Sequence, residues 1–385
     1  MNIFPLTRVF FCFLFIACAS AARAALPPPP QLAAKSWVLM DAASGAVLVN
    51  HQGSVRLPPA SLTKLMTSHV AALELQRGRL KESDLVHVSE KAWRMGGSKM
   101  FIMVGNQVAV KDLLQGIIVQ SGNDASIALA EHIAGGEDTF AAMMNDEAKR
   151  LGMADTRFVN ATGWPAEGHY SSALDMARLA RAIILEDPAH YALYKEKEFV
   201  WNNIRQPNRN LLLWRDPSVD GLKTGHTEEA GYCLVASAKR NGQRLIAAVF
   251  GASSEQSRAQ ETAKLLGYGF NFFESRVFYK QGETIQTVNV WKGAASSVKA
   301  GVTSDFAAAL PKRAAGGYQA RVVLLPGERI APIAKGATLG RVELVTADGK
   351  VVSQAPLVAL EAVEEGGIFR RIWDGIRLFF KGIFG

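Results

Sequence analysis

Two apolar runs joined by Asn241-Gly242 constrain the fold of this 385-residue chain more than any other feature. The runs, Tyr232 to Lys239 and Gln243 to Phe250, have the length and composition of strands, and an Asn-Gly pair between such runs is a strong signal for a two-residue turn. The centre of the chain is therefore predicted to form an antiparallel hairpin. Cys233 lies in the first run, which predicts a buried strand residue rather than a reactive thiol.

Helical patterns dominate the chain before this hairpin. A first hairpin is expected over residues 36–50, around the turn-like stretch Asp41-Ala42-Ala43-Ser44-Gly45. Helices are expected at residues 61–76, 110–134 with a break near Ser121, 138–151, 172–185 and, after the central hairpin, 257–273. Ser172 and Asp175 resemble a capping box with Asp in place of the usual Glu. This order of elements predicts an α/β domain over residues 25–278 that contains an antiparallel sheet.

The pattern changes beyond residue 279. Short β-like runs, such as residues 287–291, 320–325 and 342–346, are separated by turns rich in Gly, Pro and Asp. We expect a separate all-β domain over residues 279–362, and a chain of this length has room for two domains. Nothing in residues 279–362 resembles a set of catalytic residues.

The N-terminus is typical of a secretory signal. Arg8 precedes an apolar run over residues 9–19, and small residues follow up to Ala24. The run is shorter than the roughly 20 apolar residues that a membrane span needs, so cleavage of residues 1–24 is expected. An uncleaved anchor, or lipidation at Cys18, is the alternative. Removal of this segment leaves only Cys233, which excludes an internal disulfide in the mature chain.

The C-terminal segment 366–385 is predicted to be an amphipathic helix that lies in a membrane interface. At helical spacing one face collects Ile368, Phe369, Ile372, Trp373, Ile376, Phe379, Phe380, Ile383 and Phe384, and the other collects Arg370, Asp374, Arg377 and Lys381, with Arg371 on its flank. Leu378 is the one apolar residue off the apolar face. A basic, aromatic-rich amphipathic helix is typical of interfacial anchors. The alternative is a helix packed on its own protein.

The net charge of the chain excludes few classes of binding partner. A formal charge of +8 mildly favours anionic partners. The middle of the chain lacks the basic patches with interleaved aromatic residues that are typical of nucleic-acid binding, so no nucleic acid is expected.

Three short motifs in order carry the candidate chemistry: Ser61-Leu62-Thr63-Lys64, Ser121-Gly122-Asn123 and Lys223-Thr224-Gly225. Residues three apart share a helix face, so the hydroxyl of Ser61 and the amine of Lys64 can meet. A serine needs a base to become a nucleophile, and a lysine can serve if burial or a nearby positive charge lowers its pKa. Lys223 is the candidate neighbour for that effect.

The remaining motif residues suit the substrate. Ser121 could relay a proton to the leaving amine, and Asn123 could hold the lysine or a substrate amide. Lys223 and Thr224 offer an ammonium and a hydroxyl to a carboxylate. Gly225 would let a bound peptide lie against the strand edge. Alternatively, each of these residues alone is an ordinary cap, turn or surface residue.

The motif set resembles the penicillin-binding proteins and β-lactamases, and its S-G-N variant resembles the D-alanyl-D-alanine carboxypeptidases, the low-molecular-mass penicillin-binding proteins of the five and six type. The resemblance covers essentially the whole chain, including residues 97–101, 170–173, 194–199, 208–210 and 219–227. It implies a penicillin-binding, β-lactamase-like transpeptidase fold: a five-stranded antiparallel sheet flanked by helices, followed by a small all-β domain and the C-terminal helix. It also implies a periplasmic enzyme, peripherally anchored to the inner membrane, that acts on peptidoglycan pentapeptide without metal or cofactor and is inhibited covalently by β-lactam antibiotics.

By the same resemblance, Ser61 forms the acyl-enzyme with Lys64 as base. The backbone N–H groups of Ser61 and His226 are expected to form an oxyanion hole. Arg209 and Arg258 match arginines near the substrate carboxylate. One departure is that this chain has Thr162-Gly163 where close relatives can carry a His-Gly pair, which puts histidine-assisted deacylation from this loop in doubt.

Three other functions are alternatives for this chain. A β-lactamase would need a glutamate base in an E-x-x-L-N loop, and the chain has no Leu-Asn dipeptide. A D,D-endopeptidase acting on cross-links shares the same three motifs, but the second domain and the tail favour the carboxypeptidase. A catalytically silent binding or cell-shape protein is opposed by the intact Ser61, Lys64 and Lys223.

Overall fold

The computed structural model describes residues 26–313 and 317–384, so the predicted signal segment 1–24 lies outside the described residues. A five-stranded antiparallel sheet forms the centre of the first domain, in the order β2-β1-β9-β8-β7. Its strands are β1 (Ser36–Asp41), β2 (Val47–His51), β7 (Val219–Thr227), β8 (Gly231–Arg240) and β9 (Gln243–Ala252). Both predicted hairpins are confirmed, and β7 lies at one edge of the sheet.

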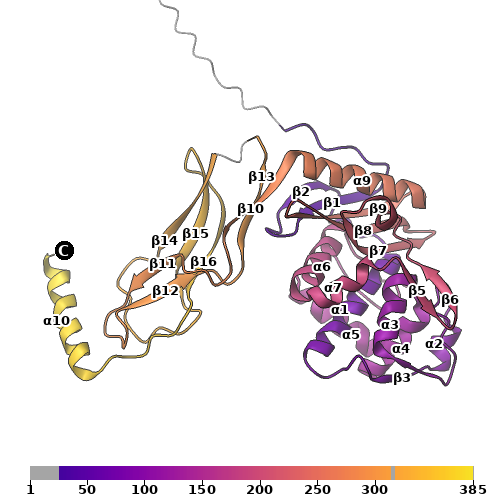
Figure 1. The fold of residues 1–385 in the computed structure, drawn as a ribbon, viewed down its shortest axis with the longest axis horizontal. Helices are drawn as coiled ribbons and strands as arrows, with labels where there is room; N and C mark the ends of the chain where they lie inside the picture. Colours follow the sequence, from indigo (N-terminus) through magenta and orange to yellow (C-terminus); the bar gives the residue numbers. More distant parts are fainter. Residues whose placement is uncertain (1–25, 314–316, 385) are drawn as a thin grey trace, which may run out of the picture.

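Both faces of this sheet are covered. Helix α9 (Glu255–Phe272) packs on one face and the helical insertion packs on the other (Figure 1). Alternate residues of β9 enter different cores: Ile246 and Ala248 join the helical insertion, whereas Leu245 and Ala247 join α9. Burial on both faces explains why this strand is a continuous apolar run in the sequence.

The helical insertion lies between β2 and β7. Its main helices are α1 (Thr63–Gln76), α3 (Val110–Gln115), α4 (Asn123–Ala134), α5 (Glu137–Arg150) and α6 (Ala173–Glu186), close to the predicted bounds. A π-helical turn at Gly116–Gln120 and the left-handed Ser121 produce the break expected near that residue. The side chain of Ser172 accepts from the backbone N–H of Asp175, which confirms the cap at the start of α6.

Shorter elements complete the first domain. They are the 3₁₀ turn Ala60–Leu62, β3 (Leu85–His87), α2 (Glu90–Arg94), β4 (Gln107–Ala109), α7 (Pro188–Tyr191), the 3₁₀ turn Ala192–Lys195, β5 (Glu198–Trp201), β6 (Ile204–Pro207) and α8 (Leu212–Arg215). The 3₁₀ turn before α1 carries the first residue of the Ser-x-x-Lys motif. Cys233 is fully buried in β8, as predicted.

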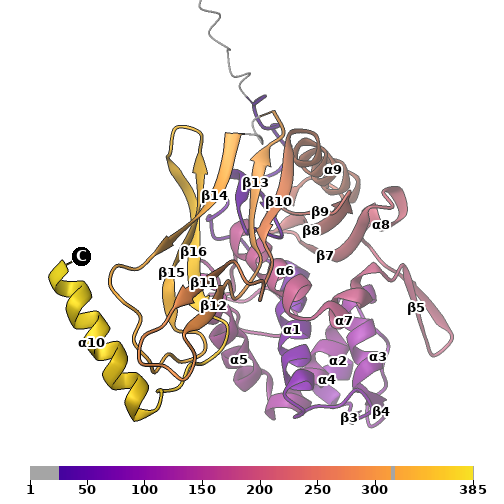
Figure 2. The same ribbon diagram turned by 60° about the vertical axis from the view of Figure 1, so that its left-hand side comes forward.

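A second, all-β region follows α9 without a loop. Its strands are β10 (Phe273–Tyr279), β11 (Gln286–Asn289), β12 (Ser297–Gly301), β13 (Phe306–Pro311), β14 (Tyr318–Leu324), β15 (Thr338–Thr346) and β16 (Val351–Ala359). β10 pairs with β13, and the other five form a sheet in the order β11-β12-β16-β15-β14 around a separate core. Figures 1 and 2 show an elongated region joined to the first domain at β10. The predicted fold class is confirmed.

Helix α10 (Ile368–Phe384) lies at the far end of this region and is held there by its polar face. The carboxylate of Asp374 is buried and accepts from the backbone N–H of Lys292 at 2.7 Å. The cationic groups of Arg377 and Lys381 lie over the ring of Trp291. The polar face of α10 therefore packs on the protein, as the alternative of a helix packed on its own protein implied for the whole segment.

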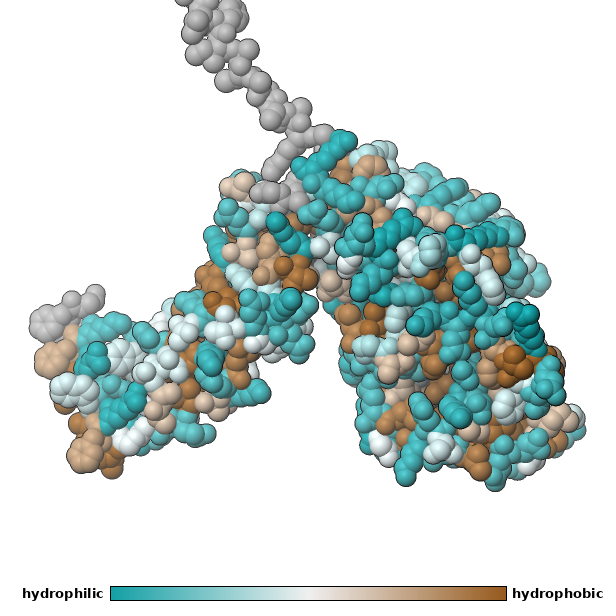
Figure 3. Space-filling view, viewed as in Figure 1, coloured by the Kyte–Doolittle hydropathy of each residue, from teal (hydrophilic) through white to brown (hydrophobic). Residues whose placement is uncertain are grey.

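The opposite face of α10 is apolar and exposed. Phe369 is 88% exposed and Trp373 is 62% exposed, and brown apolar surface marks this end of the molecule in Figure 3. Leu378, off the apolar face, is half-buried one turn after Asp374, so it lies on the protein side of the helix. None of the helices that the structure describes is both long and apolar enough to cross a membrane.

Candidate active site

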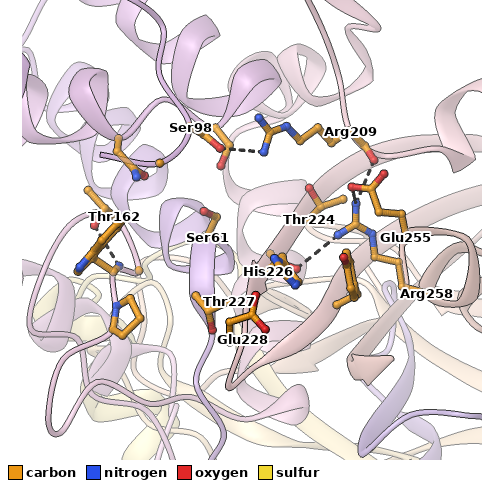
Figure 4. Close-up of a pocket in the computed structure, with 18 residues that line it drawn as sticks. Ser61, Ser98, Thr162, Arg209, Thr224, His226, Thr227, Glu228, Glu255 and Arg258 are labelled. Carbon is orange, nitrogen blue, oxygen red and sulfur yellow. Dashed lines mark hydrogen bonds and ion pairs between the residues drawn. The ribbon is translucent and has the colours of Figure 1, made fainter. Parts of the chain in front are cut away.

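The three motifs meet at one hollow of about 610 Å³ beside the edge strand β7 (Figure 4). Its wall includes Ser61, Ser98, Ser121, Asn123, Thr162, Arg209, Thr224, Gly225, His226, Tyr232 and Arg258. The first motif comes from the start of α1, the second from the start of α4, and the third from β7. Packing of the helical insertion on the sheet therefore brings together residues that are far apart in sequence.

Ser61 and Lys64 form the centre of the site. The Lys64 amine lies 3.0 Å from the hydroxyl oxygen of Ser61 and donates to the carbonyl of Thr162 at 2.7 Å. The lysine side chain is 1% exposed. Burial, and next the positive charge of Arg209, lower the pKa of Lys64 to about 7, against the opposing effect of Asp124. A large fraction of Lys64 is therefore an uncharged base at neutral pH.

Lys223 is a buried neighbour of Lys64 and is not part of the wall of the hollow. It is 3% exposed and donates to the carbonyl of Thr224 at 3.1 Å. Burial, and next the charge of Lys64, hold the pKa of Lys223 well below its usual value. Burial has the largest effect on the pKa of Lys64, and the positive charge of Arg209 comes next. The charges of Lys64 and Lys223 oppose each other, so Lys223 stays the charged neighbour that we predicted.

The second motif presents one free hydroxyl. Ser121 has left-handed backbone geometry with φ of 69°, and its buried hydroxyl has no hydrogen-bond partner among the described residues. The amide of Asn123 donates to the carbonyl of Gly96 at 2.7 Å rather than to Lys64. Sequence reasoning missed the next residue, Asp124, whose carboxylate accepts three backbone N–H groups from residues 100–102. That contact fixes the loop that carries Ser98 into the hollow.

Gly225 is needed for a contact within the protein, whereas we predicted only that it makes room for a bound peptide. A Cβ atom there would lie 2.9 Å from the carbonyl oxygen of Pro59 and 3.2 Å from the backbone nitrogen of Leu62. The glycine therefore allows β7 to approach the turn that carries the nucleophile, before any bound peptide is considered. The following residue, His226, is exposed with its ring 4.0 Å from that of Tyr232.

Two arginines lie at one end of the hollow. Arg209 donates to the hydroxyl of Ser98 at 2.8 Å. Arg258 of α9 is 3% exposed and lies over the ring of Tyr232. Its guanidinium makes long hydrogen bonds of 3.3–3.4 Å with Glu255 and with the carbonyls of Gly225 and Arg209 (Figure 4). Weakly engaged guanidinium donors in this position suit a carboxylate ligand.

The loop 160–169 also forms part of the site. The sequence analysis noted only that its Thr162 differs from the family pattern. Asn160 folds it by accepting from the backbone N–H groups of Thr162 and Gly163. Gly163 has φ of +83°, and a Cβ atom there would lie 1.8 Å from the carbonyl oxygen of Ala60. The Asn-x-x-Gly spacing was a possible sequence signal for this turn. A second hollow of about 560 Å³ shares Gly163, Pro165 and Thr227 with the first.

One cluster away from the hollow has the residue types of a metal site. Ligand atoms of His69, Glu147 and Glu186 lie within 4.8 Å of one another. Arg150 donates to both carboxylates, and His69 contacts Glu147 at 2.9 Å. These side chains therefore bond to one another.

Comparisons with known proteins agree with this geometry. Residues 22–254 match the family described as D-alanyl-D-alanine carboxypeptidase, and residues 273–365 match the family described as penicillin-binding protein 5, C-terminal domain. D-alanyl-D-alanine carboxypeptidase DacC of Escherichia coli is 43% identical over 382 residues, which cover 97% of this chain and 95% of the relative.

Solved structures give the same result. Penicillin binding protein 5 from Haemophilus influenzae is similar with a TM-score of 0.81 and 42% identity, covering 88% of this chain and 100% of that chain. Penicillin-binding protein D2 from Listeria monocytogenes, in the ampicillin bound form, is similar with a TM-score of 0.59 and 29% identity, covering 63% of this chain and 100% of that chain.

Proposed function

The chain belongs to the D-alanyl-D-alanine carboxypeptidase family, as a serine-type hydrolase and penicillin-binding protein, and on that premise we propose how its own residues carry out the reaction. The substrate is the stem pentapeptide of peptidoglycan, from which the terminal D-alanine is removed through an acyl-enzyme on Ser61. The observation that carries this assignment is a serine hydroxyl at the hollow, 3.0 Å from a buried amine with a pKa of about 7.

Acylation begins with neutral Lys64. It accepts the proton of Ser61, whose oxygen attacks the carbonyl carbon of the penultimate D-alanine. The backbone N–H groups of Ser61 and His226 receive the negative charge that develops on the carbonyl oxygen. Ser61 lies in the 3₁₀ turn that leads into α1, where the dipole of the helix also favours negative charge.

The leaving D-alanine needs a proton on its nitrogen. Ser121 supplies the route from Lys64, and its buried hydroxyl at the hollow has no partner among the described residues to break first. The carboxylate of the leaving residue binds at Thr224 and Arg258, and Arg209 adds positive charge around it. Lys223 supports this site by donating to the carbonyl of Thr224. Asn123 lines the hollow, and because its amide nitrogen donates to the carbonyl of Gly96, its amide oxygen is the group offered to a substrate N–H.

Sheet order indicates the direction of the stem peptide. Because β7 is an edge strand, an extended peptide can add to it through main-chain hydrogen bonds. A peptide with its terminal carboxylate at Thr224 and an antiparallel course runs past Thr227, toward the second hollow. The closeness of Gly225 to the nucleophile turn keeps that edge beside Ser61.

Deacylation uses the same base. After Lys64 has passed its proton to the leaving amine, it is neutral again and can accept a proton from the attacking water. The loop has Thr162 where the family resemblance allows a histidine, so it contributes its backbone carbonyl to this step and no imidazole at that position.

We also propose where the enzyme works. Residues 1–24 direct export, and the catalytic domain runs from residue 25 to the end of α9. The all-β domain begins with β10 at Phe273 rather than at residue 279 as predicted, and the segment 366–385 anchors the protein at the outer face of the inner membrane. The exposed apolar face of α10 supports this anchor, since a large apolar area at one end of a protein favours an interface with lipid.

Mass spectrometry after brief exposure to benzylpenicillin tests the nucleophile. We expect an adduct on Ser61 and none on a Ser61→Ala control. An adduct on another residue, or no adduct at any dose, would contradict the assignment. Release of D-alanine from a pentapeptide, compared with cleavage of a cross-linked dimer, separates the carboxypeptidase from an endopeptidase.

Cell fractionation tests the anchor. Deleting residues 366–385 should release an active protein into the soluble fraction. A truncated protein that stays in the membrane pellet would show that another segment holds it there.

A further inference from the structure

Loop 160–169 is bonded to the first turns of α1 at three neighbouring positions. Thr67 donates to the carbonyl of residue 161 at 2.7 Å, and Lys64 donates to the carbonyl of Thr162 at 2.7 Å. The third contact joins the hydroxyl of Thr63 to Nε2 of His169 at 2.8 Å. Thr63 is an unspecified position of the Ser-x-x-Lys motif, and His169 lies at the far end of the loop.

The surroundings of His169 define its hydrogen bonds. The backbone N–H of Val159 donates to Nδ1 at 3.1 Å, so this nitrogen carries no proton. Nε2 therefore carries it and donates to Thr63. The ring is 7% exposed, and burial followed by the charge of Lys64 lowers the pKa of His169 to about 4. The imidazole is neutral at physiological pH and holds both contacts.

The carbonyl of Thr162 matters because of the geometry of a neutral amine. Such an amine has one lone pair, which must point at the Ser61 hydroxyl if it is to accept its proton. A hydrogen bond from Lys64 to Thr162 directs one N–H away from Ser61 and leaves the lone pair toward it. The position of the Thr162 carbonyl thus limits how well the base is aligned, since four rotatable bonds otherwise leave this side chain free.

We propose that His169 is a positioning residue for acylation: by bonding Thr63, it holds the loop so that the Thr162 carbonyl orients Lys64 toward Ser61. The inference rests on the proposed roles of Ser61 and Lys64. It assigns to Thr63 and His169 a function that neither the motif nor the hollow gives them.

The test measures acylation by a chromogenic cephalosporin in stopped flow. His169→Phe keeps an aromatic ring of similar size but removes both hydrogen bonds. We expect its acylation rate constant to fall roughly 10- to 100-fold, as small misplacements of catalytic groups do, with the dissociation constant of the preceding non-covalent complex within about twofold of wild type. Thr63→Val removes the same contact from the other side and should give a similar loss.

Two further variants separate positioning from packing. His169→Gln offers an amide oxygen to Val159 and an amide N–H to Thr63, and it should restore most of the rate. His190→Phe is the matched control, because His190 is also 7% exposed and its Nε2 has no hydrogen-bond partner among the described residues. Its acylation rate should stay within about twofold of wild type.

The outcomes are distinguishable. The double variant His169→Phe, Thr63→Val should be no slower than either single variant, whereas multiplied losses would mean that the two residues act separately and would overturn the proposal. A folded His169→Phe protein that acylates at the wild-type rate would also overturn it. Wild-type protein that is never acylated on Ser61 would instead refute the proposed function.

Discussion

Replacing the buried Lys64 by methionine should stabilise the protein while it abolishes acylation. Lys64 is 1% exposed, and its pKa falls from 10.5 to about 7 on folding. A fall of that size corresponds to roughly 5 kcal/mol of folding free energy, at about 1.4 kcal/mol for each pKa unit. Because the folded state disfavours the charged lysine, this cost is fully present below pH 7 and declines as the pH rises toward 10.5.

Methionine keeps the apolar stem and removes the amine. It also leaves the Thr162 carbonyl without its donor, which costs about 1–3 kcal/mol. The net gain at pH 7 should therefore be roughly 2–4 kcal/mol, or about 4–16 °C in melting temperature for a domain of this size. At pH 9.5 little of the lysine cost remains, so the gain should nearly vanish.

Differential scanning calorimetry at both pH values is the assay. Lys111→Met is the matched control, since Lys111 is exposed and should give no such gain at either pH. The reasoning would be refuted by a Lys64→Met protein that melts no higher than wild type at pH 7. A gain of equal size at both pH values would also refute it, because it could not come from the buried charge.

Three further predictions concern the site and the tail. The acylation rate of the wild type, measured by stopped flow, should rise with pH through a midpoint near 7. Arg209→Gln should move that midpoint upward, because Arg209 lowers the pKa of Lys64, and the exposed control Arg205→Gln should leave it unchanged. Gly163→Ala should lower both the melting temperature and the acylation rate, because its Cβ would meet the carbonyl of Ala60 at 1.8 Å; an unchanged rate would contradict this. Asp374→Ala should increase hydrogen exchange in α10 and leave acylation unaltered, whereas unchanged exchange would show that the Lys292 contact does not hold the helix.

The sequence predicted the parts of the site whose geometry follows from local spacing. Ser61 and Lys64 meet because three residues make nearly one helical turn, and the hairpin at Asn241-Gly242 follows from turn chemistry. The Thr162 carbonyl could not be predicted in this way, since it is a backbone group placed by a loop about 100 residues from Lys64. Arg209 affects the pKa of Lys64 for the same reason: tertiary packing, not sequence spacing, brings it near.

The tail shows the same limit. Helical periodicity predicted its apolar and polar faces, but the residues that contact the polar face lie far away in sequence. Lys381 contacts Trp291 and Glu328, and Asp374 accepts from the backbone N–H of Lys292. A pattern of polar residues shows which side avoids apolar surroundings and does not show whether water, lipid or protein meets it.

The docking of α10 by its polar face determines how the enzyme could stand on a surface. A helix tethered only by a flexible segment would let the catalytic domain swing freely around its attachment. Here Asp374 and Lys381 tie α10 to the all-β region, and β10 continues directly from α9 of the catalytic domain. If the outer face of α10 lies in lipid, the all-β region fixes the distance between the membrane and the catalytic domain. The hollow at Ser61 is then held at one height above the bilayer. Substrate strands at that height would be trimmed, and those nearer or farther would be out of reach.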